Sequence, residues 1–183
     1  MNVPTRKSVA AGPARHRMLG IYLNDHLAGA ASGTALARRM VKEHHASAYG
    51  NDLEKLATEI AQDRRALAGL LRDLDLPVRR YKRGLARLAE RIGRMKPNGR
   101  LLRRSGLAVL VELEALRLGV QGKASLWRAL LPVSALEPRL DADRLEQLLR
   151  QAEQQIRTLD SLHARAVVQV FRLHPRTTEH TAS

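Results

Sequence analysis

The sequence predicts an all-α protein, an antiparallel up-down helical bundle of four long helices plus one short helix. Apolar residues, mostly leucine, recur at alternating three- and four-residue steps, which places them on one face of a helix. No segment has the two-residue alternation of a half-buried strand. Leu and Ala recur throughout while aromatic residues make up only 3% of the chain, and this composition favours helices.

The 183 residues suit a single domain, which we expect to span 15–173. Residues 1–14 contain Pro4 and the Gly12-Pro13 pair, so we expect a disordered basic tail there, and a second disordered tail over 174–183. The absence of Cys excludes disulfides and sulfur-ligated metal sites. No apolar run is long enough to span a membrane, and residues 1–17 lack the apolar stretch of a secretory signal, so we expect a cytoplasmic protein.

The first two helices are predicted to form an antiparallel hairpin. The first runs from about Arg15 to His45, and its small residues between Ala28 and Gly33 let a neighbouring helix approach closely. The second begins at a cap formed by residues 51–54, Asn-Asp-Leu-Glu, and ends before Pro77. The loop between them is short, which makes the two helices antiparallel neighbours.

The next two predicted helices differ in their surroundings. A helix over 79–95 carries an apolar stripe on one side and a basic stripe on another. A helix over 104–118 is apolar on nearly all sides, which is typical of a helix buried between partners. Gly119 and Gly122 are predicted to interrupt it, with Gly119 ending the helix in a left-handed conformation.

Two more helices complete the predicted bundle. A short helix over 125–131 carries the only tryptophan, Trp127. A long helix runs from a cap at Asp141 to Arg172, with leucines on its inward face.

Positive charge is concentrated in residues 79–104. This segment has eleven Lys or Arg and one acid, Glu90, so it carries +10 of the net charge of +14, while 1–78 carry +3 and 105–183 carry +1. Such a concentration attracts anionic partners, and arginine suits phosphate groups. The predicted anion-binding residues are Arg80, Arg83, Arg87, Arg91 and Arg94.

The expected partners of this basic face are nucleic-acid phosphates or an acidic protein. Tyr81 is the only aromatic residue in the segment, so stacking on bases is not expected and any nucleic acid would bind non-specifically. The alternative to anion binding, given equal weight, is that the basic face is only solvated and keeps the protein in solution. Self-association into a homo-oligomer is also permitted.

Four polar residues fall in or beside the predicted apolar seams. His26 falls at the centre of the first seam and Asp63 well inside the second, whereas Glu114 falls inside the seam of the helix over 104–118 and His163 at the border of the seam of the last helix. Groups of this kind satisfy one another in a hydrogen-bond network or hold a metal ion. Catalysis by a His26–Asp63 acid/base pair is not expected, because no nucleophile or oxyanion-stabilising loop accompanies the pair. His44 and His45, at the end of the first helix, are assigned to the helix dipole and solvent rather than to a metal ion.

Residues 119–125 faintly resemble a phosphate-binding loop. Arg117 stands where that loop needs Gly, Ala124 stands where it needs Ser or Thr, and no strand precedes it. We therefore do not predict a nucleotide site there.

The helix order and the inward polar residues resemble the ferritin-like superfamily, whose bundles hold two metal ions with carboxylates and Glu-x-x-His pairs. The matching residues are Asp25-His26, Glu59 with Gln62, Glu112 or Glu114, and Asp160 with His163. In this resemblance the basic helix takes the place of the long connection between the second and third core helices. The resemblance implies Fe, Mn or Zn held by His26, Glu59, Asp63, Glu114, Asp160 and His163.

The chain departs from the ferritin-like pattern at Gln62, which takes a His position, and at Asp25 and Asp160, which take Glu positions. These changes argue against an intact di-iron centre. We therefore expect a non-catalytic binding or interaction protein without a cofactor. A metal-binding oxidoreductase or metal-storage bundle with a degenerate di-iron site is the alternative.

Overall fold

The computed structural model describes residues 11–78 and 107–171 and shows an all-α protein, as predicted. It contains helices α1 (Ala11–His44), α2 (Gly50–Asp73), α5 (Leu107–Ser134) and α6 (Ala142–Phe171), and no strand within the described residues. The predicted helix over 79–95 and the basic residues Arg80, Arg83, Arg87, Arg91 and Arg94 lie outside the described residues. None of the described helices is long and apolar enough to cross a membrane.

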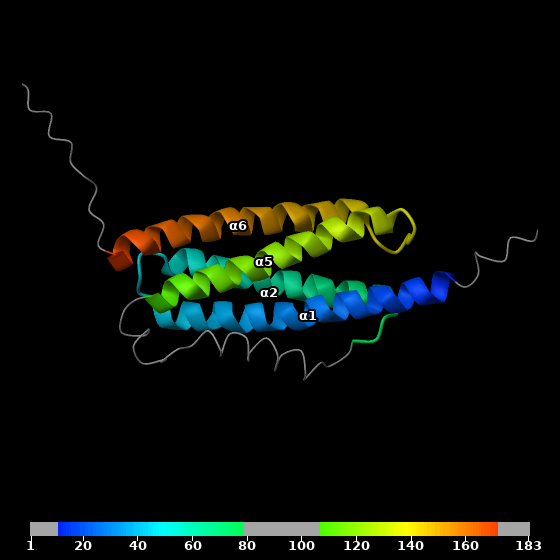
Figure 1. Ribbon diagram of the computed structural model, residues 1–183, viewed down its shortest axis with the longest axis horizontal. Helices are drawn as coiled ribbons and strands as arrows, with labels where there is room; N and C mark the ends of the chain where they lie inside the picture. The colour runs from blue at the N-terminus through cyan, green and yellow to red at the C-terminus, as the bar shows by residue number, and fades with distance from the viewer. Residues whose placement is uncertain (1–10, 79–106, 172–183) are drawn as a thin grey trace, which may run out of the picture.

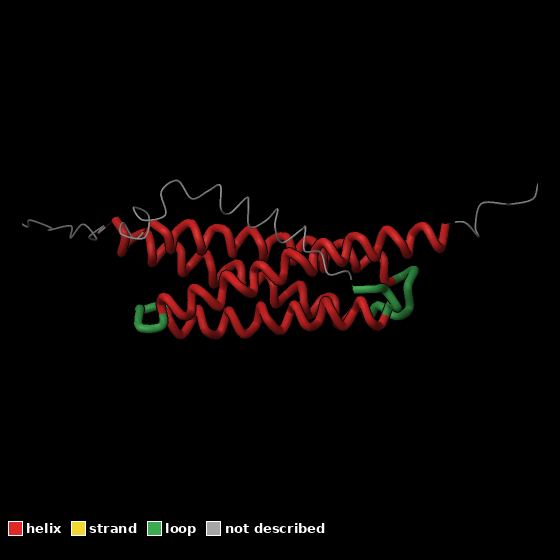
Figure 2. The backbone as a smooth tube through the Cα atoms, turned by 90° about the horizontal axis from the view of Figure 1, so that it is seen from below, coloured by secondary structure: helices red, strands yellow, loops and turns green. Residues whose placement is uncertain are grey.

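The four helices lie side by side as two hairpins (Figures 1 and 2). The chain reverses between α1 and α2 through residues 45–49, and between α5 and α6 through residues 135–141. Figure 1 also shows α2 and α5 running in the same direction, so the helices do not alternate strictly up and down. The closest packing is within the hairpins, α1 against α2 and α5 against α6, and α1 also packs on α5.

Helix α1 begins at Ala11, four residues before the predicted start. Gly12 and Pro13 therefore lie in its first turn rather than in a tail, and the predicted tail over 1–14 is wrong for residues 11–14. Proline is tolerated there because the first-turn N–H groups have no acceptor within the helix.

Helix α2 begins at Gly50 and has no side-chain cap. Its N-cap is Tyr49, and Asn51 and Asp52 lie inside the helix, so the predicted cap is wrong. A Cβ on Gly50 would lie 2.3 Å from the carbonyl oxygen of His45, and glycine therefore permits the close approach that joins α1 to α2. Asp52 in the first turn still interacts favourably with the helix dipole.

Helix α2 ends in a Schellman motif. The N–H of Asp75 donates to the carbonyl of Arg72, and the N–H of Leu76 donates to the carbonyl of Leu71 at 2.8 Å. Asp75 has a φ of 53°, in the left-handed region. The buried Leu76 then packs closely on α1, where a Cβ on Gly20 would lie 3.0 Å from its side chain.

Helix α5 runs without interruption through Gly119 and Gly122, so the predicted break, the left-handed Gly119 and the separate short helix over 125–131 are wrong. Each helical glycine costs about 1 kcal/mol relative to alanine. Burial of apolar side chains on both sides of the glycines, including Leu116 and Trp127, offsets this cost.

Helix α6 is capped as predicted, because the backbone N–H of Arg144 donates to Oδ1 of Asp141 at 3.2 Å. The seams of all four helices meet in one core. Its largest fully buried side chains are Trp127, Leu23, Met40, Leu53, Leu56, Leu71, Leu74, Leu113, Leu116, Leu126, Leu130 and Leu145.

Candidate functional site

Three of the helix seams each contain one polar residue within the core. Asp63 of α2 is only 2% exposed, as its position among leucines predicts, and Gln155 of α6 is fully buried. The third residue is Lys123 of α5, whose side chain is 13% exposed. Three- and four-residue steps separate these residues from the buried apolar residues of their own helices.

These three side chains bond to one another across three helices. The Nζ of Lys123 donates to Oδ2 of Asp63 and, at 2.5 Å, to Oε1 of Gln155. The Nε2 of Gln155 donates to the same Oδ2 of Asp63 at 3.0 Å. We call this closed group the Lys123 network. It links α2, α5 and α6 at one level of the bundle.

The Lys123 network is electrostatically unusual because it contains a buried ammonium group. Burial lowers the pKa of Lys123, while the charge of Asp63 and its hydrogen bond act in the opposite direction, with a smaller contribution from Glu59. Among the described residues, Oδ1 of Asp63 has no hydrogen-bond partner. Apart from this oxygen, the hydrogen bonds of the Lys123 network join its own members, which suits a role in fixing helix register.

A second polar group lies on the surface between α5 and α6. The Nε2 of His163 lies 3.1 Å from Oε1 of Glu114, and the Nε of Arg117 donates to Oδ1 of Asp160 at 2.5 Å. These residues, with Leu113 and Leu159, line a shallow groove of about 240 Å³. The hydrogen bonds that Arg117 donates to Asp160, together with the negative charge of Asp160, raise the pKa of Arg117.

The placement of Glu114 corrects the sequence prediction. Its side chain is 55% exposed, whereas the apolar pattern placed it inside the bundle. In the continuous helix α5 the buried face contains Leu113 and Leu116, and Glu114 is turned away from it. His163 lies at the border of the buried face of α6, as predicted.

His26 lies apart from both groups. The apolar pattern places it at the centre of the buried face of α1, but it is only partly buried, and its ring centroid lies 4.7 Å edge-on from that of the exposed Tyr22. Burial lowers the pKa of His26, while the nearby Asp25 acts in the opposite direction.

The six residues considered as metal ligands are therefore divided among separate environments. Glu114, Asp160 and His163 share the surface groove, Asp63 belongs to the Lys123 network with Glu59 near it, and His26 contacts Tyr22. A metal ion needs its ligands to converge within a few ångströms. The described residues do not bring these six together.

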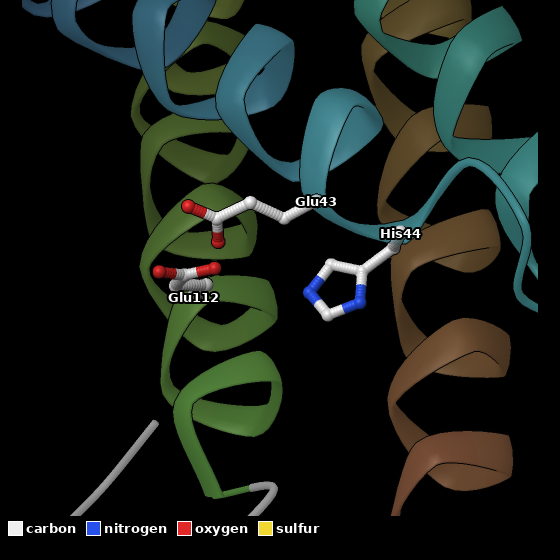
Figure 3. A group of neighbouring side chains, drawn as sticks. All are labelled: Glu43, His44 and Glu112. Atoms are coloured by element: carbon white, nitrogen blue, oxygen red, sulfur yellow. The ribbon is translucent and has the colours of Figure 1, made fainter. Parts of the chain in front are cut away.

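A different set of three candidate ligands does converge (Figure 3). Glu43 and His44 are the last two residues of α1, and Glu112 lies near the start of α5. One ligand atom from each lies within 4.8 Å of the other two. The Nη2 of Arg39 donates to Oε1 of Glu112 at 2.6 Å, and the ring of His44 lies 5.9 Å from that of Tyr49.

Sequence reasoning missed Lys123, Gln155 and Glu43 as site residues. Lys123 and Gln155 each lie three and four residues from buried residues of their own helix. For Lys123 this signal becomes visible once α5 is known to be continuous, whereas for Gln155 it is already present in the sequence of α6. Glu43 carries no such signal, because only the packing of α1 on α5 brings it to Glu112. Comparison of the chain with protein-family models, curated proteins and solved structures finds no match.

Proposed function

We propose that this protein is a non-catalytic helical bundle that binds polyanions through the arginine-rich segment 79–104. The anion-contacting residues in this proposal are Arg80, Arg83, Arg87, Arg91 and Arg94. The observation that carries it is the charge of +10 within 26 residues. Arginine presents a planar fork of donors that suits the paired oxygens of phosphate groups.

The charge balance of the bundle supports this proposal. Residues 11–78 contain nine Lys or Arg and eight Asp or Glu, and residues 107–171 contain eight of each. The bundle is therefore close to neutral by itself. Cations that form ion pairs within it are Arg39, Arg117, Lys123, Arg128, Arg139, Arg150 and Arg165.

The basic segment has no such balance, because Glu90 is its only acid. Its neutralisation requires anions from outside the segment, and a nucleic-acid backbone supplies them at regular spacing. We favour phosphates over an acidic protein because nine of the eleven cations are arginine. Binding is expected to be independent of base sequence and to weaken steeply with salt.

We also propose that the bundle is ferritin-like. The supporting observation is that α2 and α5 run in the same direction while each hairpin is antiparallel (Figure 1). A four-helix bundle with one long connection in the middle of its chain has this order, and ferritin-like folds have one such connection.

The binding proposal is tested by titrating labelled duplex DNA and RNA at about 50 and 200 mM salt. The variant changes Arg80, Arg83, Arg87, Arg91 and Arg94 to Gln. A matched control changes five exposed arginines of the bundle to Gln, namely Arg64, Arg65, Arg72, Arg128 and Arg150. The first variant should bind much more weakly, with a salt slope smaller by about 4 to 5, since each phosphate contact contributes about 0.9. Equal loss in both variants, or none in the first, would overturn the proposal.

A further inference from the structure

We propose that Glu43, His44 and Glu112 form a site for a divalent transition-metal ion, with Zn²⁺ as the best fit. The site would join the last turn of α1 to the start of α5 (Figure 3). It is distinct from the six residues suggested by the sequence pattern, and it does not depend on the anion-binding proposal.

The geometry of the three side chains is close to that of a metal site. Figure 3 shows the carboxylates of Glu43 and Glu112 facing each other with the imidazole of His44 beside them. Their ligand atoms lie within 4.8 Å of one another. Zinc bonds of about 2.1 Å in a tetrahedral arrangement place ligand atoms roughly 3.4 Å apart. The ligand atoms are therefore at most about 1.4 Å farther apart than in a zinc site, and binding would require small rotations of these side chains, of which Glu43 is exposed.

The electrostatics of the group also favour a cation. Two carboxylates approach each other here, and like charges at this separation repel. Arg39 pairs with Oε1 of Glu112, but Oε2 is buried and has no hydrogen-bond partner among the described residues. A buried carboxylate oxygen without a partner is costly, and a metal ion would satisfy it.

Arg39 is compatible with a bound ion. It contacts Oε1 of Glu112 and leaves Oε2 for the metal. In this arrangement the guanidinium orients the ligating carboxylate from outside the coordination shell, as hydrogen-bonded partners do in other metal sites.

The set of ligand types selects the ion. One imidazole with two carboxylates suits Zn²⁺ and its neighbours, whereas Mg²⁺ prefers oxygen ligands and water. Three protein ligands leave one tetrahedral position for water. No redox step is needed, and the effect of the ion is to hold α1 and α5 together.

The test is calorimetric titration of the full chain, first freed of metal with a chelator, with ZnCl₂ and separately with MgCl₂. His44→Gln and Glu43→Gln remove one ligand each in the last turn of α1. His45→Gln is the matched control, since His45 is the adjacent exposed histidine and makes its own contact with the carbonyl of Lys42. Glu114→Gln is the control for Glu112→Gln on the same helix.

We expect one equivalent of Zn²⁺ to bind the parent chain and the two controls alike, with little Mg²⁺ uptake. His44→Gln, Glu43→Gln and Glu112→Gln should each weaken Zn²⁺ binding by about tenfold or more. X-ray absorption of the zinc complex should show oxygen and nitrogen neighbours with one imidazole. Zn²⁺ binding that survives His44→Gln, that is lost in His45→Gln, or that is absent from the parent chain would overturn the proposal. Circular dichroism of each variant without zinc separates loss of the site from loss of the fold.

Discussion

Lys123 of α5 donates a hydrogen bond to the buried carboxylate of Asp63 in α2, sixty residues earlier in the chain. Gln155 of α6 bonds to both residues, so three helices meet in one polar layer. An ion pair of this kind contributes little net stability, but removal of one partner leaves an uncompensated charge in the core.

The two members of this pair should therefore behave very differently when changed singly and together. Asp63→Ala should lower the free energy of unfolding by about 3–5 kcal/mol, because it leaves the Lys123 ammonium group without its counter-charge. The double variant Asp63→Leu/Lys123→Met should be close to the parent or more stable, because it replaces the pair with apolar side chains. Urea unfolding of the single and double variants provides the measurement. If the double variant costs the sum of Asp63→Leu and Lys123→Met measured singly, the pair does not act as a unit.

Burial of Lys123 also predicts a dependence of stability on alkaline pH. Because burial lowers the pKa of Lys123 from 10.5, there is a pH range in which the unfolded chain holds this proton and the folded chain does not. The free energy of unfolding should rise with pH through the range between the lowered pKa and 10.5. Lys123→Met should remove this rise, whereas Lys55→Met, at an exposed lysine, should keep it. A rise that persists in Lys123→Met would contradict the assignment.

His26 predicts a second dependence, at acid pH. Burial lowers the pKa of His26 from 6.5, so the unfolded chain binds a proton more readily than the folded chain. The stabilising contribution of the neutral ring is present above pH 6.5 and is lost as the pH falls through 6.5 towards the lowered pKa. Unfolding curves measured across this range should show that the free energy of unfolding falls less steeply with decreasing pH in His26→Gln than in the parent. His45→Gln, at an exposed histidine, should follow the parent.

The left-handed Asp75 predicts a stabilising substitution. Its φ of 53° is strained for residues with a side chain and free of strain for glycine. Asp75→Gly should raise the free energy of unfolding by about 0.5–1 kcal/mol, since Asp75 lies at the C′ position of a Schellman motif. The Arg139–Asp75 ion pair that it removes is exposed and contributes little. In thermal unfolding, the Tm of Asp75→Gly should be higher than that of the parent, and the Tm of Asp75→Ala should be lower.

Two glycines offer a matched comparison of the same substitution. Gly119→Ala should stabilise the protein by about 1 kcal/mol, because Gly119 is within α5 and open space surrounds the position of a Cβ. Gly50→Ala should destabilise it, because the new Cβ would lie 2.3 Å from the His45 carbonyl oxygen, which is a backbone atom. Denaturant midpoints of the two variants should move in opposite directions from the parent. A stable Gly50→Ala protein would show that the loop between α1 and α2 can relax.

The local pattern of residues was sufficient for much of the bundle. Periodic leucines predicted the helical class, Asp141 predicted the start of α6, and the position of Asp63 among leucines predicted that it lies in the core. These features depend on residues within a few turns of one another, and helical periodicity is a local property. The same rule failed at Glu114, because an apolar pattern on nearly all sides of α5 does not indicate which side faces the core.

The order of residues along the chain is enough to show which residues share a helix face and where the excess positive charge lies. The continuation of α5 through Gly119 and Gly122 depends on packing within the bundle, because burial of the flanking side chains outweighs the low helix propensity of glycine. Only the tertiary structure brought Lys123 to Asp63 and Gln155, and Glu43 and His44 to Glu112. These contacts depend on which helices pack together and on how far each is shifted along the bundle axis, and both are set by packing across the whole core.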